Sequence, residues 1–205
     1  STWSPDDKYI YFTSWRQGNG DVFRKSSLGT GSDEIVLADA DWSSLWSLSA
    51  DGSTGAVMTN ASSRRTSWDI SILNLADGKI RPFLMTPFSD LFPVLTRDGR
   101  WIAYTSNETG RNEVYAQGFP KSGGKWQIST GGGTHPRWRR DGKELFYLSP
   151  ERKLMAVDVK TAGAAFEVGQ PRELFQSSVI ATPPVLHPYD VTADGKRFLM
   201  SPTRE

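Results

Sequence analysis

The amino-acid sequence predicts an all-β protein made of repeated four-stranded antiparallel sheets. Three observations predict it. A short hairpin-turn motif recurs five times, with aspartates separated by 45, 47, 43 and 53 residues, at Asp6, Asp51, Asp98, Asp141 and Asp194. The runs between the turns are rich in β-branched and aromatic residues and are bounded by Gly, Asp, Ser or Pro, as strands are. No segment shows the 3.6-residue apolar period of a helix, so almost no helix is expected.

One copy of the repeat shows the expected order of elements most clearly. A first strand, a hairpin turn, a second strand, a polar loop, a third strand, a second turn and a fourth strand follow one another at residues 91–96, 97–100, 101–106, 107–112, 113–119, 121–124 and 125–130. Gly99 supplies the positive φ of the hairpin turn. Pro93 cannot donate to a strand ladder, which favours an edge strand.

The other copies repeat this order. Second strands are expected at residues 9–14, 55–59, 144–148 and 197–200, third strands at 21–24, 68–73 and 154–159, and fourth strands at 34–37, 80–85 and 172–175. Four antiparallel strands in a period of about 45 residues form the blade of a β-propeller. One blade cannot cover both faces of its own sheet, so the repeat is needed for packing.

The chain is expected to be a single partial propeller over residues 1–205, with about four and a half blades. The repeats are expected at residues 1–40, 41–86, 87–133, 134–180 and 181–205, the last incomplete. Closed propellers usually carry four to eight blades. Three interpretations remain open: a C-terminal piece of a larger propeller, a five-bladed ring closed by its last strands, or closure through a second copy of the chain.

Composition excludes several classes of function. The net charge is +1, from 24 basic and 23 acidic residues, which gives no electrostatic signature of nucleic-acid binding or of membrane contact by this segment. Cysteine is absent, which excludes disulfides and thiolate chemistry. No phosphate loop, kinase motif or G-x-S-x-G nucleophile motif occurs, so the chain is expected to be non-catalytic and to need no cofactor.

One end of the blades is the best candidate for a binding surface. In a propeller, the loops between second and third strands share one face with the connections from fourth to first strands. Arginines and tryptophans recur in these loops and could hold an anionic or planar ligand or a protein partner. The candidate residues are Trp15, Arg16, Arg64, Arg65, Trp68, Arg111, His135, Arg152 and His187. The alternative is that each arginine pairs with a nearby acidic residue and only supports the fold.

The two histidines each precede a proline at what the sequence suggests is the same first-strand position. They could take a metal or a proton. A pair of histidines without a clear carboxylate partner is a weak metal signal, so a locally hydrogen-bonded strand start is the simpler interpretation. The repeated aspartates are explained by turn chemistry rather than by calcium binding.

The repeat resembles a known family. Ser4-Pro5-Asp6-Asp7-Lys8 and its partners, followed by an apolar strand and an acidic third-strand start, are similar to the WD40-like PD40 repeat of TolB-type propellers. The later half, from residue 124 to residue 191, looks closest to the C-terminal propellers of bacterial serine/threonine protein kinases. Asp7 departs from the turn glycine of the pattern. The resemblance implies a bacterial, extracytoplasmic module.

The resemblance implies a non-catalytic sensor or recognition module of a bacterial signalling protein, with an unidentified protein or small molecule as partner. Self-association is expected if the ring is incomplete. One alternative is the gating propeller of a prolyl-oligopeptidase-like serine hydrolase. Another is a stand-alone assembly or scaffold protein of the TolB kind.

Overall fold

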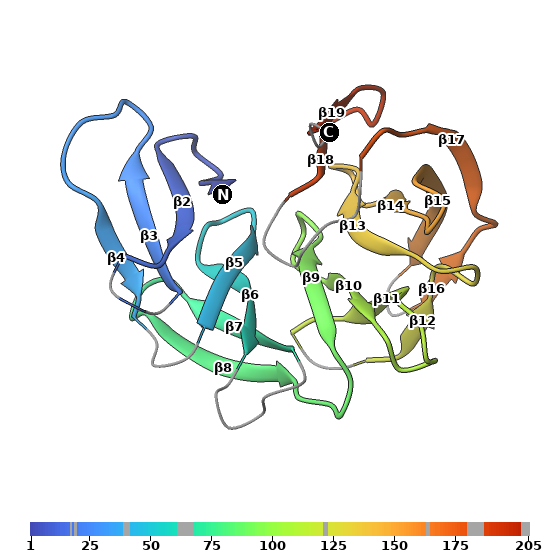
Figure 1. Ribbon diagram of the computed structural model, residues 1–205, viewed down its shortest axis with the longest axis horizontal. Coiled ribbons are helices and arrows are strands. Elements are labelled where there is room, and N and C mark those ends of the chain that lie inside the picture. Colours follow the sequence, from blue (N-terminus) through green and yellow to red (C-terminus); the bar gives the residue numbers. More distant parts are fainter. Residues whose placement is uncertain are drawn as a thin grey trace. The chain divides into compact units, whose positions relative to one another are not determined.

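The computed structural model of the chain describes residues 1–16, 18, 20–38, 42–60, 68–120, 123–162, 165–179 and 187–201. The chain divides into two compact units, Ser1–Pro93 (unit 1) and Val94–Glu205 (unit 2). Every regular element among the described residues is a strand, and these strands pair antiparallel (Figure 1). The all-β class predicted from the sequence is therefore confirmed.

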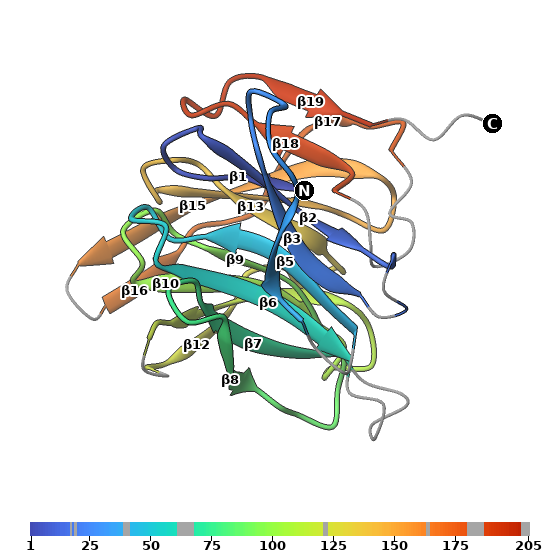
Figure 2. The same cartoon turned by 90° about the vertical axis from the view of Figure 1, so that its left-hand side faces the viewer.

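Unit 1 contains two four-stranded sheets, blades 1 and 2. Blade 1 has the order β1-β2-β3-β4, with strands Thr2–Trp3, Tyr9–Ser14, Asp21–Ser26 and Glu34–Leu37. Blade 2 has the order β5-β6-β7-β8, with strands Trp42–Leu48, Thr54–Asn60, Asp69–Asn74 and Lys79–Leu84. Each strand pairs with its neighbour along the chain, which is the meander expected of a propeller blade (Figure 2).

The third sheet, blade 3, has the order β12-β11-β10-β9. Its strands in chain order are β9 (Asp90–Leu95), β10 (Trp101–Ser106), β11 (Glu113–Gly118) and β12 (Lys125–Gln127). The boundary between the two units falls within β9.

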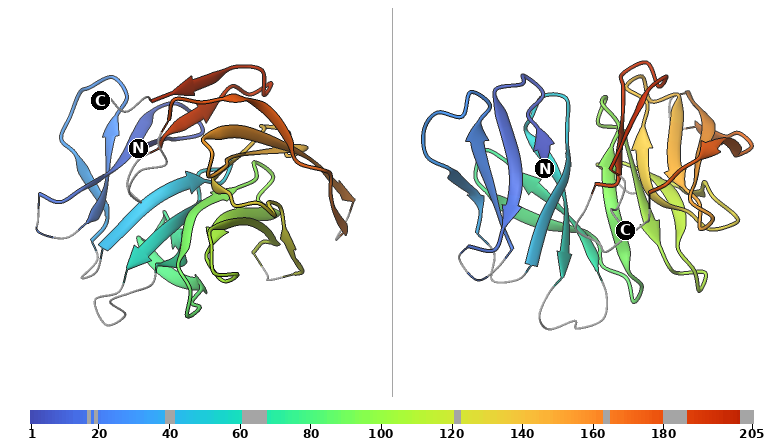
Figure 3. Two further views of the ribbon diagram at one scale, coloured as in Figure 1. Left: turned by 45° about the vertical axis from the view of Figure 1, so that its right-hand side comes forward. Right: turned by 45° about the horizontal axis from the view of Figure 1, so that its top comes forward.

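Unit 2 continues with blade 4 and an incomplete blade 5. Blade 4 comprises β13 (Thr134–Trp138), β14 (Glu144–Leu148), β15 (Lys153–Ala162), β16 (Ala165–Val168) and β17 (Arg172–Gln176). Blade 5 is the hairpin β18 (Tyr189–Val191) and β19 (Phe198–Met200). Figure 3 shows this red hairpin beside the orange strands of blade 4.

The strands fall close to their predicted bounds, with one main difference in blade 4. β15 is ten residues long, because its second half forms an additional hairpin with β16 before the chain returns to pair β17 with its first half. Figure 2 shows this orange hairpin extending beyond the other strands of blade 4. The four-residue β16 lacks the turn signals that identified the other strands.

The hairpin turns between first and second strands carry their own hydrogen bonds. In blade 3 the Thr96 hydroxyl donates to Asp98 Oδ1 at 2.7 Å and accepts from the Trp101 amide at 3.0 Å. The Arg100 amide donates to the same Asp98 oxygen at 3.1 Å. Equivalent bonds from a serine or threonine hydroxyl to the aspartate occur in blades 1, 2 and 5. These bonds hold the pKa of Asp51 down to about 2, chiefly through the Ser49 hydroxyl.

The residue after each of these aspartates has a left-handed backbone. Gly52, Gly99, Gly142 and Gly195 have φ between 64° and 73°. Asp7, which stands in the glycine position of blade 1, has φ 60°. The departure from the repeat pattern at Asp7 therefore leaves the turn geometry unchanged, because aspartate tolerates this conformation better than most residues do.

Each unit has apolar layers between its sheets. In unit 1, Tyr11, Val22, Leu45, Val57 and Leu73 form one buried cluster. In unit 2, Phe166 of the additional hairpin joins the main cluster together with Trp101. The Phe166 ring lies 4.6 Å from Trp101, 4.9 Å from Trp126 and 6.4 Å from Trp138, measured between ring centroids. The hairpin therefore covers an aromatic layer shared by blades 3 and 4.

The inner strands tolerate proline because they lie at the edge of their sheets. Pro93 is in β9 and Pro136 is in β13, and each of these strands lies at one end of its sheet order. The residues before them, Phe92 and His135, have φ of 57° and 54°. In blade 4 this conformation coincides with a register shift between Thr134 and Arg137, so β13 contains a bulge.

Candidate functional site

The residues predicted to form a binding surface lie where their loops were expected. We call the end of the blades that carries the second-to-third-strand and fourth-to-first-strand connections the loop end. Trp15, Arg16, Arg111 and Arg152 follow second strands, and Trp68 precedes a third strand. His135 lies in β13 and His187 immediately precedes Pro188 and β18. Arg64 and Arg65 lie outside the described residues.

Tryptophans gather at the loop end of unit 1. The ring of Trp42 lies 6.1 Å from Trp15 and 4.6 Å from Trp68, the second pair edge to face. Trp15 keeps 51% of its surface exposed. Sequence reasoning missed Trp42, which begins β5 at the fourth-to-first-strand connection; its place in a connection to the loop end was the signal that could have identified it.

Arg16 supports the fold of blade 1. Its Nη1 donates to Asp33 Oδ2 at 2.7 Å and its Nε donates to Ser14 Oγ at 3.1 Å. Its guanidinium carbon lies 4.2 Å from the centroid of the Phe23 ring. Arg16 therefore matches the alternative interpretation from the sequence, in which an arginine pairs with a nearby acidic residue and supports the fold, because its charge is paired with Asp33 of the same blade.

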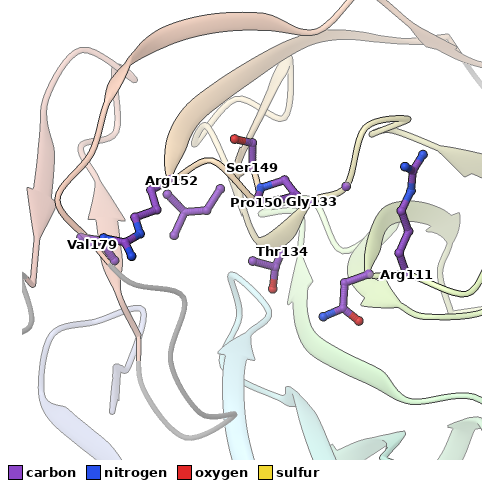
Figure 4. A pocket seen from close by; sticks show the side chains of 10 residues that line it. Arg111, Gly133, Thr134, Ser149, Pro150, Arg152 and Val179 are labelled. Atoms are coloured by element: carbon purple, nitrogen blue, oxygen red, sulfur yellow. The ribbon is translucent and has the colours of Figure 1, made fainter.

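The loop end of unit 2 contains a pocket of about 470 Å³. It is lined by residues of four connections and the adjoining strand ends, namely Arg111, Asn112, Gly132, Gly133, Thr134, Leu148, Ser149, Pro150, Arg152 and Val179. Figure 4 shows Arg111 and Arg152 at opposite sides of the pocket, with Thr134, Ser149 and Pro150 between them. The structure thus brings two of the predicted arginines to one concave site.

Arg111 is held at the pocket by a buried carboxylate. Its Nε donates to Glu113 Oε1 at 2.7 Å, and its Nη2 donates to the carbonyl oxygen of Thr130. Glu113 is fully buried and also accepts from the Ser129 hydroxyl and, at 3.0 Å, from the Gly132 amide. Glu113 therefore fixes both the arginine and the glycine connection that form one side of the pocket.

Arg152 lies in a turn that repeats the hairpin-turn chemistry at the loop end. Ser149 Oγ donates to Glu151 Oε2 at 2.8 Å and accepts from the Lys153 amide at 3.3 Å. Arg152 has φ 65° and its amide donates to the Ser149 carbonyl at 3.0 Å. The signal was present in the sequence, because Ser149-Pro150-Glu151-Arg152-Lys153 resembles Ser4-Pro5-Asp6-Asp7-Lys8.

Beneath the pocket lies a buried polar cluster in unit 2. Thr134 Oγ1, which lines the pocket, lies 3.0 Å from His135 Nδ1. The Tyr189 hydroxyl donates to the His135 carbonyl at 2.8 Å. Arg137 Nη2 donates to His187 Nδ1; a guanidinium can only donate, so this histidine is neutral. The two histidines are not at equivalent positions, since His135 lies four residues before the turn residue Arg139 and His187 lies five before Thr192.

Because His135 is buried, we expect the free energy of unfolding of the chain to fall as the pH is lowered. Desolvation, and then the nearby Arg137 charge, lower the pKa of His135 from 6.5 to about 3. The unfolded chain therefore binds the proton first, and the folded state loses about 1.4 kcal/mol for each pH unit below 6.5 until the folded pKa is reached. Burial also lowers the pKa of His187, so both histidines contribute to the slope.

Urea unfolding between pH 7 and pH 4.5 measures this dependence. The variant His135→Asn is expected to retain the fold, because asparagine tolerates the left-handed backbone at this position, and to show about half the wild-type slope. An unchanged slope in this variant would show that His135 does not titrate between the two states.

Comparison with known proteins places the repeat in a family. The family model described as the TolB β-propeller domain, PD40, matches residues 2–191. The chain belongs to the TolB β-propeller family. The PD40 resemblance inferred from the turn motif is therefore confirmed, while the closer similarity to kinase propellers stays a prediction. No match is found among curated proteins.

Solved structures share the fold of this TolB-type propeller chain. TolB from Acinetobacter baumannii is 18% identical with a TM-score of 0.75, over 98% of this chain and 48% of that chain. A protein assigned as TolB in Agrobacterium tumefaciens is 16% identical with a TM-score of 0.71, over 84% of this chain and 63% of that chain. A puromycin-hydrolysing peptidase from Mycobacterium tuberculosis is 16% identical with a TM-score of 0.61, over 92% of this chain and 33% of that chain. The chain thus spans less than two thirds of each of these proteins.

Two further findings concern the described part of this TolB-family chain. It contains no helix with the length and hydrophobicity needed to cross a membrane. Within the same residues, no group of three or more His, Cys, Asp or Glu side chains is placed to hold a metal ion.

Sequence reasoning missed most of the pocket lining. Asn112 and Val179 carry no recurring pattern and belong to connections of different lengths. They come together because blades 3 and 4 pack side by side, which brings loops distant in the sequence to one place. These lining residues could have been predicted only from the three-dimensional arrangement of neighbouring blades.

Proposed function

We propose that this TolB-family chain is a non-catalytic recognition module that binds a protein or small-molecule ligand at the loop end of its blades. The observation that carries the proposal is the pocket in unit 2, whose lining comes from four connections and includes the exposed arginines Arg111 and Arg152. Concave sites with a few convergent polar groups are where proteins usually bind ligands.

The opposite end of the blades supports this choice by contrast. The turns there are short, and their serine, threonine and aspartate side chains bond to one another and to the turn amides. Groups satisfied within a turn have little to offer to a ligand. The loop end instead carries exposed Trp15 and the pocket with two exposed arginines. The opposite end of unit 1 also has a pocket, of about 550 Å³, but its Asn74 and Asp77 side chains already accept from turn amides.

A non-catalytic role fits the chemistry of the pocket. The Thr134 hydroxyl contacts His135, which is the geometry of a nucleophile beside a base. However, a general base works best when its pKa is close to the operating pH. Burial lowers the pKa of His135 to about 3, so its imidazole is too weak a base to activate the hydroxyl near neutral pH.

The finer role that we propose is that of an extracytoplasmic sensor in a bacterial signalling protein. This proposal rests on the similarity of residues 124–191 to kinase propellers and on bacterial structural relatives that are longer than this chain. The alternative of a gating propeller is favoured by one observation, the fold shared with a puromycin-hydrolysing peptidase over one third of that chain.

Site-specific photocrosslinking tests the proposal. A benzoylphenylalanine in place of Asn112 lies at the loop end, whereas one in place of Lys143 lies in the turn between β13 and β14. A ligand or partner in an extract of the source cells is expected to crosslink to the first variant. An excess of the chain without benzoylphenylalanine should reduce this crosslinking by competing for the same ligand. Equal crosslinking from both positions, or from the turn alone, would contradict the proposal.

A further inference from the structure

The backbone at Arg152 is strained in a way that the turn itself does not require. In the related turns the fourth position is glycine in four copies and aspartate in the fifth, whereas here it is arginine with φ 65°. The left-handed region costs a residue with a Cβ roughly 1–2 kcal/mol. Glycine would remove that cost and keep the turn. Strain of this kind persists where the side chain is needed, and it is found mostly at ligand sites.

The guanidinium of Arg152 is available to a ligand. Within the described part of the chain it forms no hydrogen bond or ion pair, and the same holds for the side-chain amide of Asn112 on the other side of the pocket. The remaining polar groups of the lining are engaged: Ser149 with Glu151 and Thr134 with His135. The donors left for a ligand are therefore those of an arginine and an amide.

The nearby carboxylates do not line the pocket. Glu113 is buried and accepts from Arg111, Ser129 and Gly132. Glu151 accepts from the Ser149 hydroxyl, which lowers the pKa of its carboxyl group. Arg111 is ion-paired with Glu113, so the charge that the lining leaves unpaired is that of Arg152, which favours an anionic ligand.

The rest of the lining is apolar. Leu148 and Val179 are buried, and the Pro150 ring is exposed beside them. A volume of about 470 Å³ lies within the range of small-molecule sites and suits a group of the size of an amino acid or a dipeptide.

We propose that this pocket binds a carboxylate attached to a short apolar group, with Arg152 holding the carboxylate and the apolar group lying against the exposed ring of Pro150. The planar guanidinium matches the two oxygens of a carboxylate. The inference depends on the proposed function only in placing ligand binding at the loop end. The carboxylate has two possible sources, a free small acid and the C-terminus of a peptide.

Amide chemical-shift titrations of the ¹⁵N-labelled 205-residue chain test the proposal. The probe is N-acetyl-leucine, with N-acetyl-leucinamide as its uncharged match and inorganic phosphate as a general anion. N-acetyl-leucine at millimolar concentration is expected to shift the resonances of Asn112, Gly133 and Arg152 and to saturate. No shift, or equal binding of the amide or of phosphate, would overturn the carboxylate assignment.

Two substitutions at Arg152 separate binding from folding. Arg152→Gln should weaken N-acetyl-leucine binding about ten- to a hundredfold, the range for loss of a charged hydrogen bond. Arg152→Gly should weaken it equally while raising the melting temperature, because it relieves the strained backbone. The matched control is Arg140→Gln, which changes an exposed arginine of the β13–β14 turn and should bind like the wild type. Unchanged affinity in Arg152→Gln would overturn the proposal.

The tripeptide Ala-Ala-Leu identifies the source of the carboxylate. Tighter binding of the tripeptide than of N-acetyl-leucine assigns the site to a peptide C-terminus, and binding of N-acetyl-leucine alone assigns it to a small acid. If neither binds while crosslinking at the loop end persists, the carboxylate inference fails and the proposed recognition function stands.

Discussion

Replacing Glu113 with alanine is expected to lower the free energy of unfolding of unit 2 by roughly 3 kcal/mol, which would be the largest effect of any single side-chain truncation at the pocket. The carboxylate is fully buried and accepts from the Arg111 Nε, the Ser129 hydroxyl and the Gly132 amide. Its loss leaves two buried donors without an acceptor and frees an arginine. Urea unfolding followed by tryptophan fluorescence measures the change.

A matched control shows whether burial is the cause. Glu167→Ala removes an exposed glutamate from β16 in the same unit and should change stability by less than about 0.5 kcal/mol. Glu113→Gln keeps one acceptor oxygen and the side-chain volume, so it should lie between the two alanine variants. Equal stability of Glu113→Ala and Glu167→Ala would show that the buried hydrogen bonds contribute nothing.

Replacing Gly132 with alanine should destabilise unit 2 by about 3 kcal/mol through two separate effects. Gly132 has φ 94°, so any Cβ is strained. A Cβ at this position would also lie 2.4 Å from Cγ of Pro150, whose ring cannot rotate away. The chain must therefore shift at the pocket wall, and the Gly132 amide would lose its bond to Glu113.

Gly99→Ala separates strain from collision. Gly99 has φ 64°, and nothing lies within 4 Å of the position of its missing Cβ. Only the backbone cost remains, so Gly99→Ala should lose about 1 kcal/mol in the same unfolding measurement. If the two alanine variants were equally destabilised, the contact with Pro150 would add nothing to the free energy of unfolding. The description of Gly132 as tightly packed would then be wrong.

The repeat made most of the fold predictable. Each turn motif fixes a hairpin, and the run of β-branched and aromatic residues after it marks the second strand, so β2, β10 and β14 have the bounds expected from the sequence. The β15–β16 hairpin was not predicted because it is an insertion in a single copy. Its strand signal is short, and only the burial of Phe166 explains why it folds back.

The candidate site was predictable only in part. Arg111 and Arg152 could be placed because repeat position determines which end of a blade a loop occupies. Their roles could not be, since Arg111 is bonded to a buried glutamate whereas Arg152 has no partner within the described residues, and this difference arises from packing. The histidines were assigned equivalent positions by their prolines, but His135 lies four residues before its turn residue Arg139 and His187 lies five before Thr192.

The hairpin that carries Phe166 should make the thermal unfolding of blades 3 and 4 cooperative. In repeat proteins each unit touches only its neighbours, and terminal units can fray one at a time. Here one side chain contacts tryptophans contributed by β10, β12 and β13. Blades 3 and 4 therefore share one aromatic cluster, and neither blade can unfold without removing the contacts that bury the other. Thermal unfolding of unit 2 should consequently be a single event in which both blades are lost together.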